Sequence, residues 1–362
     1  MAKLPADFVM QAPLIDDGHL LLLLKEHFGI KYAKTEQLTG YDDLNFLLND
    51  VKFEDPSYEK KFGRKFVCKF SNPFEARNPE LMDSQIKLMS HLTANGIPTP
   101  SVVPSCQNTN FVLAKMTENV TLPLRIFTFL PGSLMEQFGY SSATYKVVGN
   151  LLGHFHVVTD DFEDPWIRKN TVPISIESWT YLQSEFHTLV DSNRIGIENQ
   201  ELCLRVFRDF GSQILEQRSR FEEGLVHSDF NETNILLEQH GDEIKVAGLL
   251  DFGDCHYSIR LMDVASAILY LILDAPNNSE AKIEWRKIAT ELLSAYKEIR
   301  PFEVDVSVLQ LAACGRLVAS LIYGLRTVRI NARGDDPSYT LKTQKRGWET
   351  LKILSDPTFT LF

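Results

Sequence analysis

Several features that this sequence lacks narrow the possibilities before any motif is considered. Its 362 residues include only five cysteines, and no two of them form a Cys-x-x-Cys pair, so we predict neither a disulfide framework nor a zinc site. Acidic residues outnumber basic residues by 48 to 37, which gives a formal net charge of −11. We therefore expect no nucleic-acid partner and no membrane partner, because both require clustered basic side chains.

Long apolar runs are missing as well. The longest, at 20–24 and 265–273, are far shorter than the ~20 residues that a membrane-spanning helix needs. Residues 1–7 contain no apolar stretch typical of a signal peptide. No Gly-x-x-x-x-Gly-Lys-Ser/Thr segment occurs, which excludes a Walker-type phosphate site. We expect a reduced, cytoplasmic protein, and the sequence leaves its oligomeric state open.

The predicted elements change in character near Leu130-Pro131-Gly132. Before this joint we expect a capped helix ending near residue 29, an inserted helix at 79–95, and strands at 35–39, 44–53, 65–70, 101–104, 111–115 and 124–129. After it we expect mainly helices, at 145–158, 179–190, 201–221, 263–273, 280–299, 306–329 and 342–354, with short strands at 224–226, 235–238 and 246–250. The pattern predicts a small α+β lobe followed by a larger helical lobe.

Two short motifs carry the chemistry. In the first, His227-Ser228-Asp229 is followed by Asn234, five residues after the aspartate. In the second, an apolar stretch leads into Asp251-Phe252-Gly253-Asp254. The segment between the motifs is short enough to form a hairpin that returns Asp251 to the side of Asn234. Together the motifs resemble the catalytic loop and the metal-binding turn of protein-kinase-like phosphotransferases.

This resemblance assigns a role to each motif residue. Asp229 orients the acceptor hydroxyl and takes its proton, while Asn234 and Asp251 offer oxygen ligands to Mg²⁺. An unperturbed aspartate has a pKa of ~3.9 and is a weak base at neutral pH, so its position matters more than its basicity.

A phosphotransferase also needs a cation for the donor phosphates, and Lys69 is the candidate. It is the single charge in Phe66-Val67-Cys68-Lys69-Phe70, and a buried cation requires an anionic partner. The candidates on the following helix are Glu80, Asp83 and Gln85, of which we prefer Asp83. If the partner is Gln85, a hydrogen bond replaces the ion pair. The alternative is an exposed lysine on an edge strand.

The chain departs from protein kinases in two places. It has no Gly-x-Gly-x-x-Gly loop and no Ala-Pro-Glu segment, and Gly40-Tyr41-Asp42-Asp43-Leu44-Asn45-Phe46 stands where the loop is expected. These features resemble the aminoglycoside phosphotransferase and choline-kinase-like family of small-molecule kinases. Within that family the chain is similar over essentially its whole length to the hydroxylysine kinases. Three further segments carry this similarity: Gly-Ile-Pro-Thr at 96–99, Arg-Ile-Phe-Thr-Phe-Leu-Pro-Gly at 125–132 and Gly-Leu-Leu-Asp-Phe-Gly-Asp at 248–254.

The resemblance implies a fold and an activity. The fold would be α+β and two-lobed, as in protein kinases, with a small antiparallel-sheet N-lobe that carries one helix and a larger, mainly helical C-lobe. Residues 1–130 would form the nucleotide-binding lobe, and 131–362 the catalytic and substrate-binding lobe. The activity would be transfer of the γ-phosphate of GTP, with ATP possible, to the 5-hydroxyl of 5-hydroxy-L-lysine.

The resemblance also implies where the ligands bind. Gly40, Tyr41, Asp42 and Asn45 would cover the donor phosphates that Lys69 and Asp83 help to hold. The base would lie against the backbone near Thr128 and Leu130.

The expected amino-acid substrate has two ammonium groups and one carboxylate, so its pocket should combine acids with an arginine. Asp254 would face an ammonium group, and Arg316 would bind the carboxylate. Arg316 could instead form a buried ion pair with an acid such as Asp263, although we expect Asp263 to cap the helix that follows it.

Three alternatives remain open at this stage. The chain could phosphorylate another amino alcohol, of the choline, ethanolamine, homoserine or methylthioribose type. It could be a pseudokinase that binds without catalysis, although Lys69, Asp229, Asn234 and Asp251 are all present. It could be a protein kinase, which the missing Ala-Pro-Glu segment opposes.

Overall fold

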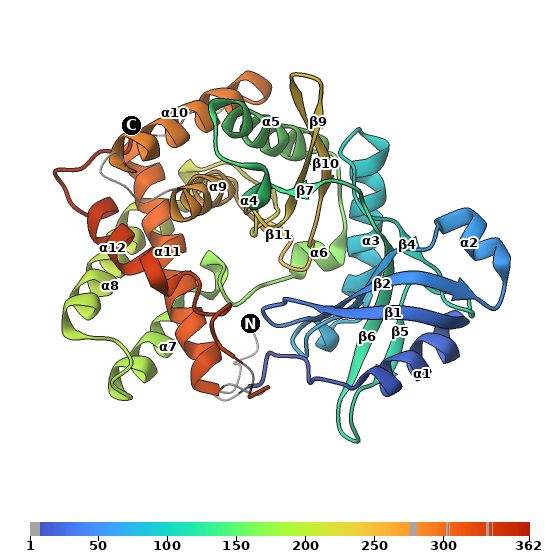
Figure 1. The fold of residues 1–362 in the computed structure, drawn as a ribbon. Coiled ribbons are helices and arrows are strands. Elements are labelled where there is room, and N and C mark those ends of the chain that lie inside the picture. The colour runs from blue at the N-terminus through green and yellow to red at the C-terminus, as the bar shows by residue number, and fades with distance from the viewer. Residues whose placement is uncertain (1–7, 276–280, 302, 304, 331–332, 335) are drawn as a thin grey trace.

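The computed structural model describes residues 8–275, 281–301, 303, 305–330, 333–334 and 336–362. Within them the chain forms two lobes, seen in Figure 1 as a sheet-rich part coloured blue to teal and a helical part coloured green to red. The predicted fold class, a small antiparallel-sheet lobe before a larger helical lobe, is confirmed.

The N-lobe is built on a six-stranded sheet in the order β1-β2-β3-β6-β4, with β5 paired to β6. All pairings are antiparallel. Its strands are β1 (Ile30–Leu38), β2 (Leu44–Phe53), β3 (Phe66–Phe70), β4 (Val102–Val103), β5 (Val112–Lys115) and β6 (Thr121–Thr128), and its helices are α1 (Asp17–Phe28), α2 (Pro56–Phe62), the short 3₁₀ helix η1 (Glu75–Arg77) and α3 (Glu80–Ala94).

Local signals account for the ends of α1. The side chain of Asp16 accepts a hydrogen bond from the His19 backbone N–H, and Gly29 ends the helix in the left-handed region with φ 63°, as the sequence predicted. Helix α2 was not predicted. It begins at Asp55, which caps it, and at Pro56 in its first turn, a start signal that its seven-residue length made easy to miss.

The C-lobe is mainly helical. Its helices are α4 (Met135–Phe138), α5 (Ser142–Val158), α6 (Pro165–Lys169), η2 (Ile176–Ser178), α7 (Trp179–Asp191), α8 (Ile197–Phe210), η3 (Gly211–Leu215), η4 (Arg218–Arg220), α9 (Leu261–Asp274), α10 (Ala281–Ile299), α11 (Val306–Ile330) and α12 (Gln344–Leu354). Two small sheets complete it, β10-β9-β7 and β11-β8, from β7 (Ser133–Leu134), β8 (Glu223–Val226), β9 (Ile235–His240), β10 (Glu243–Leu249) and β11 (His256–Ile259). The expected helix over 201–221 is wrong in its second half, because α8 ends at Phe210 and a π-helical turn follows.

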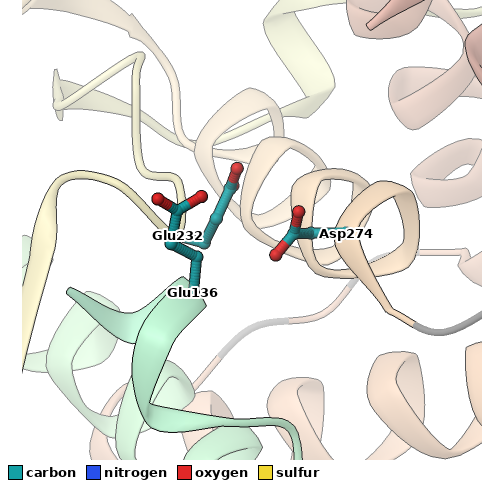
Figure 2. Close-up of side chains that lie close together, drawn as sticks. All are labelled: Glu136, Glu232 and Asp274. Carbon is teal, nitrogen blue, oxygen red and sulfur yellow. The ribbon is translucent and has the colours of Figure 1, made fainter. Parts of the chain in front are cut away.

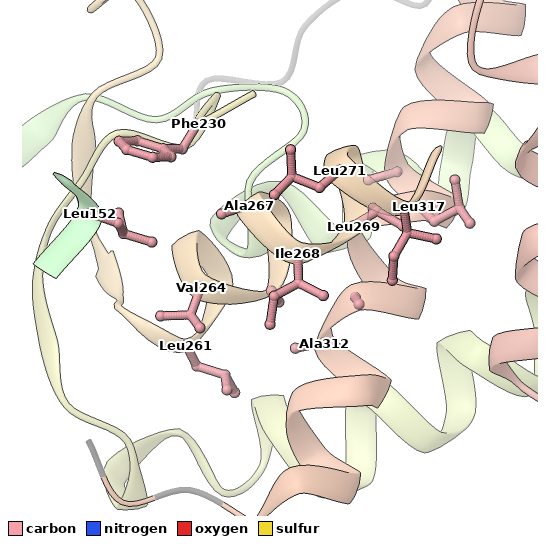
Figure 3. Close-up of a cluster of buried hydrophobic side chains, with 14 of the residues drawn as sticks. Leu152, Phe230, Leu261, Val264, Ala267, Ile268, Leu269, Leu271, Ala312 and Leu317 are labelled. Atoms are coloured by element: carbon pink, nitrogen blue, oxygen red, sulfur yellow. The ribbon is translucent and has the colours of Figure 1, made fainter. Parts of the chain in front are cut away.

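Two apolar cores support the lobes. The smaller core packs α1 against the N-lobe sheet. The larger core is centred on α9, which is apolar on nearly all sides and is therefore buried in the C-lobe. Figure 3 shows α9 residues such as Ile268 and Leu269 beside Ala312 and Leu317 of α11, with Phe230 nearby. Phe230 follows Asp229 directly, so the core reaches the catalytic loop.

The first described residues join the two lobes. Arg326 of α11 donates to the Phe8 carbonyl (2.7 Å), and Arg333 donates to the Ala12 carbonyl (2.8 Å). The Ala12 N–H in turn donates to the Asp42 carbonyl of the N-lobe (2.7 Å).

Helix α11 is the one described helix that is long and apolar enough to cross a membrane. Of its most apolar window, 61% is buried inside the protein. Its hydropathy is therefore that of a core helix, packed against α9 and α12.

Candidate active site

The catalytic loop, residues 227–234, lies between β8 and β9 and is held by one buried carboxylate. Asp263, in the first turn of α9, accepts hydrogen bonds from the backbone N–H groups of His227 (2.7 Å) and Ser228 (2.7 Å) and contacts the His156 ring (3.1 Å). Burial alone would raise the pKa of Asp263, but these hydrogen bonds and the neighbouring histidines lower it. Asp263 therefore fixes the loop backbone, and our expectation that it caps its own helix was wrong.

The His227 ring completes this anchor. It contacts the Leu250 carbonyl (3.0 Å) and packs edge-on against Phe230 and Phe252. The ring links the two motifs and is buried, which suits a positioning role.

Asp229 and Asn234 face each other across the loop. The Asn234 amide Nδ2 donates to the carboxylate Oδ2 of Asp229 (2.8 Å) and to its backbone carbonyl (2.9 Å). Because the amide nitrogen is used in this way, the Asn234 Oδ1 atom remains as a ligand for a cation. The Asp229 side chain is 29% exposed, which leaves it accessible to an acceptor hydroxyl.

The hairpin β9–β10 brings the second motif to the first. Leu249 is paired with Ile235, and the Leu250 N–H donates to the Asn234 carbonyl (2.9 Å). Asp251 comes next, with its backbone in the left-handed region at φ 58°. The predicted hairpin is confirmed, and it presents an amide oxygen and a carboxylate at one edge. Such hard oxygen donors fit Mg²⁺, which keeps much of its shell for water and phosphate.

Lys69 on β3 is paired with two carboxylates. Its Nζ lies 2.6 Å from Asp43 Oδ2 and 2.8 Å from Asp251 Oδ1. Desolvation by itself would lower the pKa of Lys69 and raise that of Asp251, but their attraction outweighs it. The pKa of Lys69 is therefore raised and that of Asp251 lowered. Lys69 is 11% exposed, so the alternative of an exposed edge lysine is excluded.

The expected partner on α3 was wrong. Among the described residues, the carboxylates within ion-pair distance of Lys69 are those of Asp43 and Asp251, and neither Glu80 nor Asp83 is among them. Asp83 instead accepts a hydrogen bond from Asn110 (2.9 Å).

Gln85, the other candidate on α3, is bound to an arginine. It accepts a hydrogen bond from Arg125 (2.6 Å), whose second amino group donates to Ser71 (2.8 Å). Arg125 is paired with Lys69 on the neighbouring strand β6. The Gln85 side chain therefore binds Arg125 and not Lys69.

Glu75 is a further acid of the site that sequence reasoning missed. It is buried, lies 3.8 Å from Arg125, and accepts from Asn72 (3.2 Å). A Cβ atom on Gly253 would come within 2.5 Å of its Oε1, which explains why a glycine follows Phe252. Burial and the nearby Asp43 charge raise the pKa of Glu75 to about 7.

The loop between β1 and β2 is tied to the C-lobe. Tyr41 stacks on Tyr323 of α11 (5.7 Å between ring centroids), and the Tyr323 hydroxyl donates to Asp42 (2.7 Å). Arg333 donates to the carbonyls of Gly40 (3.2 Å) and Asp42 (2.8 Å). Burial raises the pKa of Asp42 to about 6. The Tyr41 and Asp42 side chains thus face α11, so the loop could contact phosphates mainly through its backbone.

Three other residues were expected to contact the nucleotide: Asn45, Thr128 and Leu130. Asn45 stands opposite Lys69 on β2, and no described residue donates to its buried Oδ1. The Thr128 hydroxyl accepts from the Ser101 N–H (3.0 Å), and Leu130 packs against Gly248 of β10. The side chains of Thr128 and Leu130 thus contact other residues of the protein. The backbone of 128–130 remains the expected contact for a nucleotide base.

Arg316 and Asp254 both lie near Asp229. Arg316 of α11 is 4% exposed, lies 3.5 Å from Asp229 Oδ1, and stacks over the Tyr270 ring (5.3 Å). No described residue accepts from its Nε or Nη1. Arg316 is therefore paired with Asp229 and not with Asp263.

The pKa of Asp254 is raised well above its ordinary value by desolvation and then by the charges of Asp229 and Asp251, while Arg316 opposes the rise.

A second acidic cluster adjoins the catalytic loop, and no sequence motif predicted it. Figure 2 shows Glu232 of the loop between Glu136 of α4 and Asp274 at the end of α9. The ammonium group of Lys342 lies 2.9, 3.1 and 3.5 Å from Glu136, Glu232 and Asp274. A cation of the chain itself therefore already occupies the cluster, which joins the segment before α12 to the loop.

Comparison with known proteins agrees with this geometry. The model of the phosphotransferase enzyme family, also called APH, matches residues 39–302. A protein named hydroxylysine kinase from Mus musculus is 24% identical over 95% of this chain and 90% of its own, and one from Bos taurus is 25% identical with the same coverage.

Solved structures share the fold. An amicoumacin kinase in complex with AMP-PNP and Ca²⁺ has a TM-score of 0.67 at 17% identity and covers 93% of this chain and 94% of its own. The GDP complex of an aminoglycoside phosphotransferase has a TM-score of 0.60 at 15% identity, with coverage of 93% and 96%.

Proposed function

Because this chain belongs to the phosphotransferase enzyme family and is a kinase that acts on an alcohol group, we propose that it phosphorylates 5-hydroxy-L-lysine. The γ-phosphate of GTP would be transferred to the 5-hydroxyl, giving 5-phosphohydroxy-L-lysine in amino-acid catabolism. The observation that carries this proposal is the match to proteins named hydroxylysine kinase along 94% to 95% of the chain, at 21% to 25% identity.

In this proposal the two lobes have different roles. Residues 1–130 form the nucleotide-binding lobe, and 131–362 the catalytic and substrate-binding lobe. Lys69 holds the donor phosphates, the loop Gly40–Asn45 covers them, and the backbone at Thr128 and Leu130 contacts the base. Support comes from the largely buried position of Lys69, whose ammonium group is held by the carboxylates of Asp43 and Asp251.

Asp229 acts on the acceptor. Its carboxylate accepts the hydroxyl proton as the oxygen approaches the phosphorus, and Asn234 and Arg316 hold that carboxylate in place. Asn234 Oδ1 and Asp251 would hold Mg²⁺. When bound, this ion offsets the negative charge of the phosphates.

The substrate groups fit the residues beside Asp229. In 5-hydroxylysine the side-chain ammonium is attached one carbon from the hydroxyl-bearing carbon, so it must bind near the catalytic carboxylate. Asp254 fits this position, because desolvation and then the charges of Asp229 and Asp251 raise its pKa against the opposing effect of Arg316, and an ammonium group bound beside it would oppose that rise further. Arg316 would attract the substrate carboxylate through the guanidinium atoms that do not contact Asp229.

The donor and the compartment belong to the same proposal. A GDP complex among the fold neighbours supports a guanine nucleotide, whereas AMP-PNP in another supports the adenine alternative. The five cysteines are all free, which is consistent with a cytoplasmic location.

A second candidate substrate is homoserine. A protein named homoserine kinase from Methylobacillus flagellatus is 23% identical over 63% of this chain and 63% of its own. Homoserine carries a hydroxyl but no side-chain ammonium, so it would leave Asp254 without a partner.

The test measures release of nucleoside diphosphate by the purified protein with Mg²⁺. GTP and ATP are supplied in turn with 5-hydroxy-L-lysine, lysine, homoserine, choline or ethanolamine. We expect turnover with hydroxylysine, a preference for GTP, and none with lysine, which has no hydroxyl at that carbon. Turnover with homoserine but not hydroxylysine would replace the substrate. No turnover with any acceptor, despite nucleotide binding, would favour a catalytically silent binding module.

A further inference from the structure

We propose that Asp43, from the loop between β1 and β2, is the residue that positions Lys69 for the donor phosphates. In this role it replaces an acid on α3 and leaves Asp251 available for Mg²⁺. The inference rests on the proposed kinase function but not on the identity of the acceptor.

Asp43 is held firmly enough for this role. Its Oδ2 lies 2.6 Å from Lys69 Nζ, and its Oδ1 accepts from both the backbone N–H (2.8 Å) and the side chain (2.9 Å) of Asn72. Arg333 donates to its backbone carbonyl (2.7 Å). The side chains of Asp43 and Lys69 are each 11% exposed. A carboxylate fixed on both oxygens holds a lysine in one orientation better than a free side chain does.

Of the three helix residues that might compete, Glu80 is exposed and the other two contact residues other than Lys69. Asp83 accepts from Asn110, and Gln85 accepts from Arg125. Arg125 lies opposite Lys69 on β6 and is 2% exposed, so it separates α3 from the lysine by both position and charge.

The two carboxylates that contact Lys69, those of Asp43 and Asp251, have different roles in the proposed reaction. In the proposed function Asp251 would also serve as a ligand for Mg²⁺ together with Asn234, whereas Asp43 would serve Lys69 alone. If Asp43 were absent, the remaining attraction of Lys69 would fall on Asp251 alone, and lysine and metal would compete for one carboxylate. Loss of Asp43 should therefore weaken nucleotide and metal binding together and leave acceptor binding unchanged.

The experiment compares Asp43→Asn with the wild-type enzyme in two assays. The first is equilibrium binding of a fluorescent GTP analogue at increasing Mg²⁺, which requires no acceptor and so remains informative if the proposed substrate is wrong. We expect the nucleotide Kd and the Mg²⁺ concentration for half-saturation each to rise about tenfold to a hundredfold, as for loss of a buried charged hydrogen bond. The second is steady-state turnover, in which the KM for the acceptor should change less than about twofold.

Matched variants decide between the possible partners. Asp83→Asn makes the same chemical change at the acid of α3 that we preferred as the partner, and Asp50→Asn makes it at an exposed ion pair with Lys34. We expect both to bind nucleotide within about twofold of wild type. Asp43→Glu keeps the charge and should recover part of the lost affinity. Asp43→Ser provides a second variant should Asp43→Asn fail to fold, as judged by its circular dichroism.

Two results would overturn the inference. One is unchanged nucleotide and Mg²⁺ affinity in folded Asp43→Asn or Asp43→Ser. The other is an equal loss of affinity in Asp83→Asn.

Discussion

The catalytic loop and the phosphate-binding lysine belong to different lobes and are stabilised by different kinds of contact. The loop is fixed by backbone N–H groups that donate to one buried carboxylate, Asp263, 35 and 36 residues away in the sequence. The described contacts of the Lys69 ammonium group come from side chains, from Asp43 on one side and from Asp251, 182 residues away, on the other.

This difference explains why one half of the site follows a recognisable motif and the other half does not. Backbone N–H groups are present whatever the side chain, so this anchor leaves the loop side chains free for chemistry, and the motif consists of the residues with chemical roles, Asp229 and Asn234. A lysine held by side chains can exchange one acid for another at a nearby position, as Asp43 for an acid of α3. The predictions below test each half, from the largest expected effect to the smallest.

The largest effect should come from Asp229→Asn in the catalytic loop. The amide cannot accept the hydroxyl proton, so we expect turnover to fall about 10³-fold, while the Kd for Mg²⁺–nucleotide changes less than about threefold because Lys69, Asn234 and Asp251 are unchanged. Single-turnover phosphate transfer and equilibrium binding would measure the two quantities. Near-normal turnover would show that another group acts on the acceptor.

Asp263→Asn should break the anchor of that loop. The amide replaces one of the two accepting oxygens, so one buried backbone N–H of His227 or Ser228 loses its partner. We expect a loss of about 3 kcal/mol in the free energy of unfolding, measured by urea denaturation. Asp191→Asn, an exposed residue at the end of α7, is the control and should change it by less than about 0.5 kcal/mol. Equal effects would mean that the loop does not depend on Asp263.

The smallest expected effect is on the pH dependence of the free energy of unfolding. It distinguishes the residues around Lys69 from those that anchor the catalytic loop. The pKa of Glu75 beside Lys69 is raised from 4.5 to about 7 in the folded protein, so between these values the folded state binds more protons than the unfolded state. Stability should therefore fall as pH rises from about 4.5 to about 7, by about 1–3 kcal/mol.

The measurement is the difference in unfolding free energy between wild type and Glu75→Gln across this range. Asp263 contributes little to the slope there, because its pKa is lowered in the folded state and its ordinary pKa of ~3.9 leaves it mostly ionised in the unfolded state above pH 4.5. A difference that stays constant with pH would contradict the role assigned to Glu75.

Much of the fold was predictable from local sequence. Apolar periodicity and end signals gave α1, α3, α5, α9 and the strands of the N-lobe, with errors of a few residues at their ends. Helix α2 and the short strands β7 and β11 were missed because they are two to seven residues long and carry little periodicity.

The candidate site divides in the same way. Asp229, Asn234 and Asp251 were identified from spacing, since a loop and a hairpin join them within 25 residues. Asp43, Glu75, Asp263 and Glu232 were missed as partners, although Asp43 lay inside the quoted loop motif. An isolated acid in a sequence carries no sign of which cation or N–H group it will meet.

The sequence by itself determined the lobe order, the two catalytic motifs and the lysine on β3, because each depends on residues that are neighbours along the chain. Only the tertiary structure decided which acid holds Lys69, which carboxylate anchors the catalytic loop, and that Tyr41 and Asp42 face α11. These choices depend on charges brought within 3 Å from distant segments. At that range, small differences in position determine which of several chemically equivalent partners is bound.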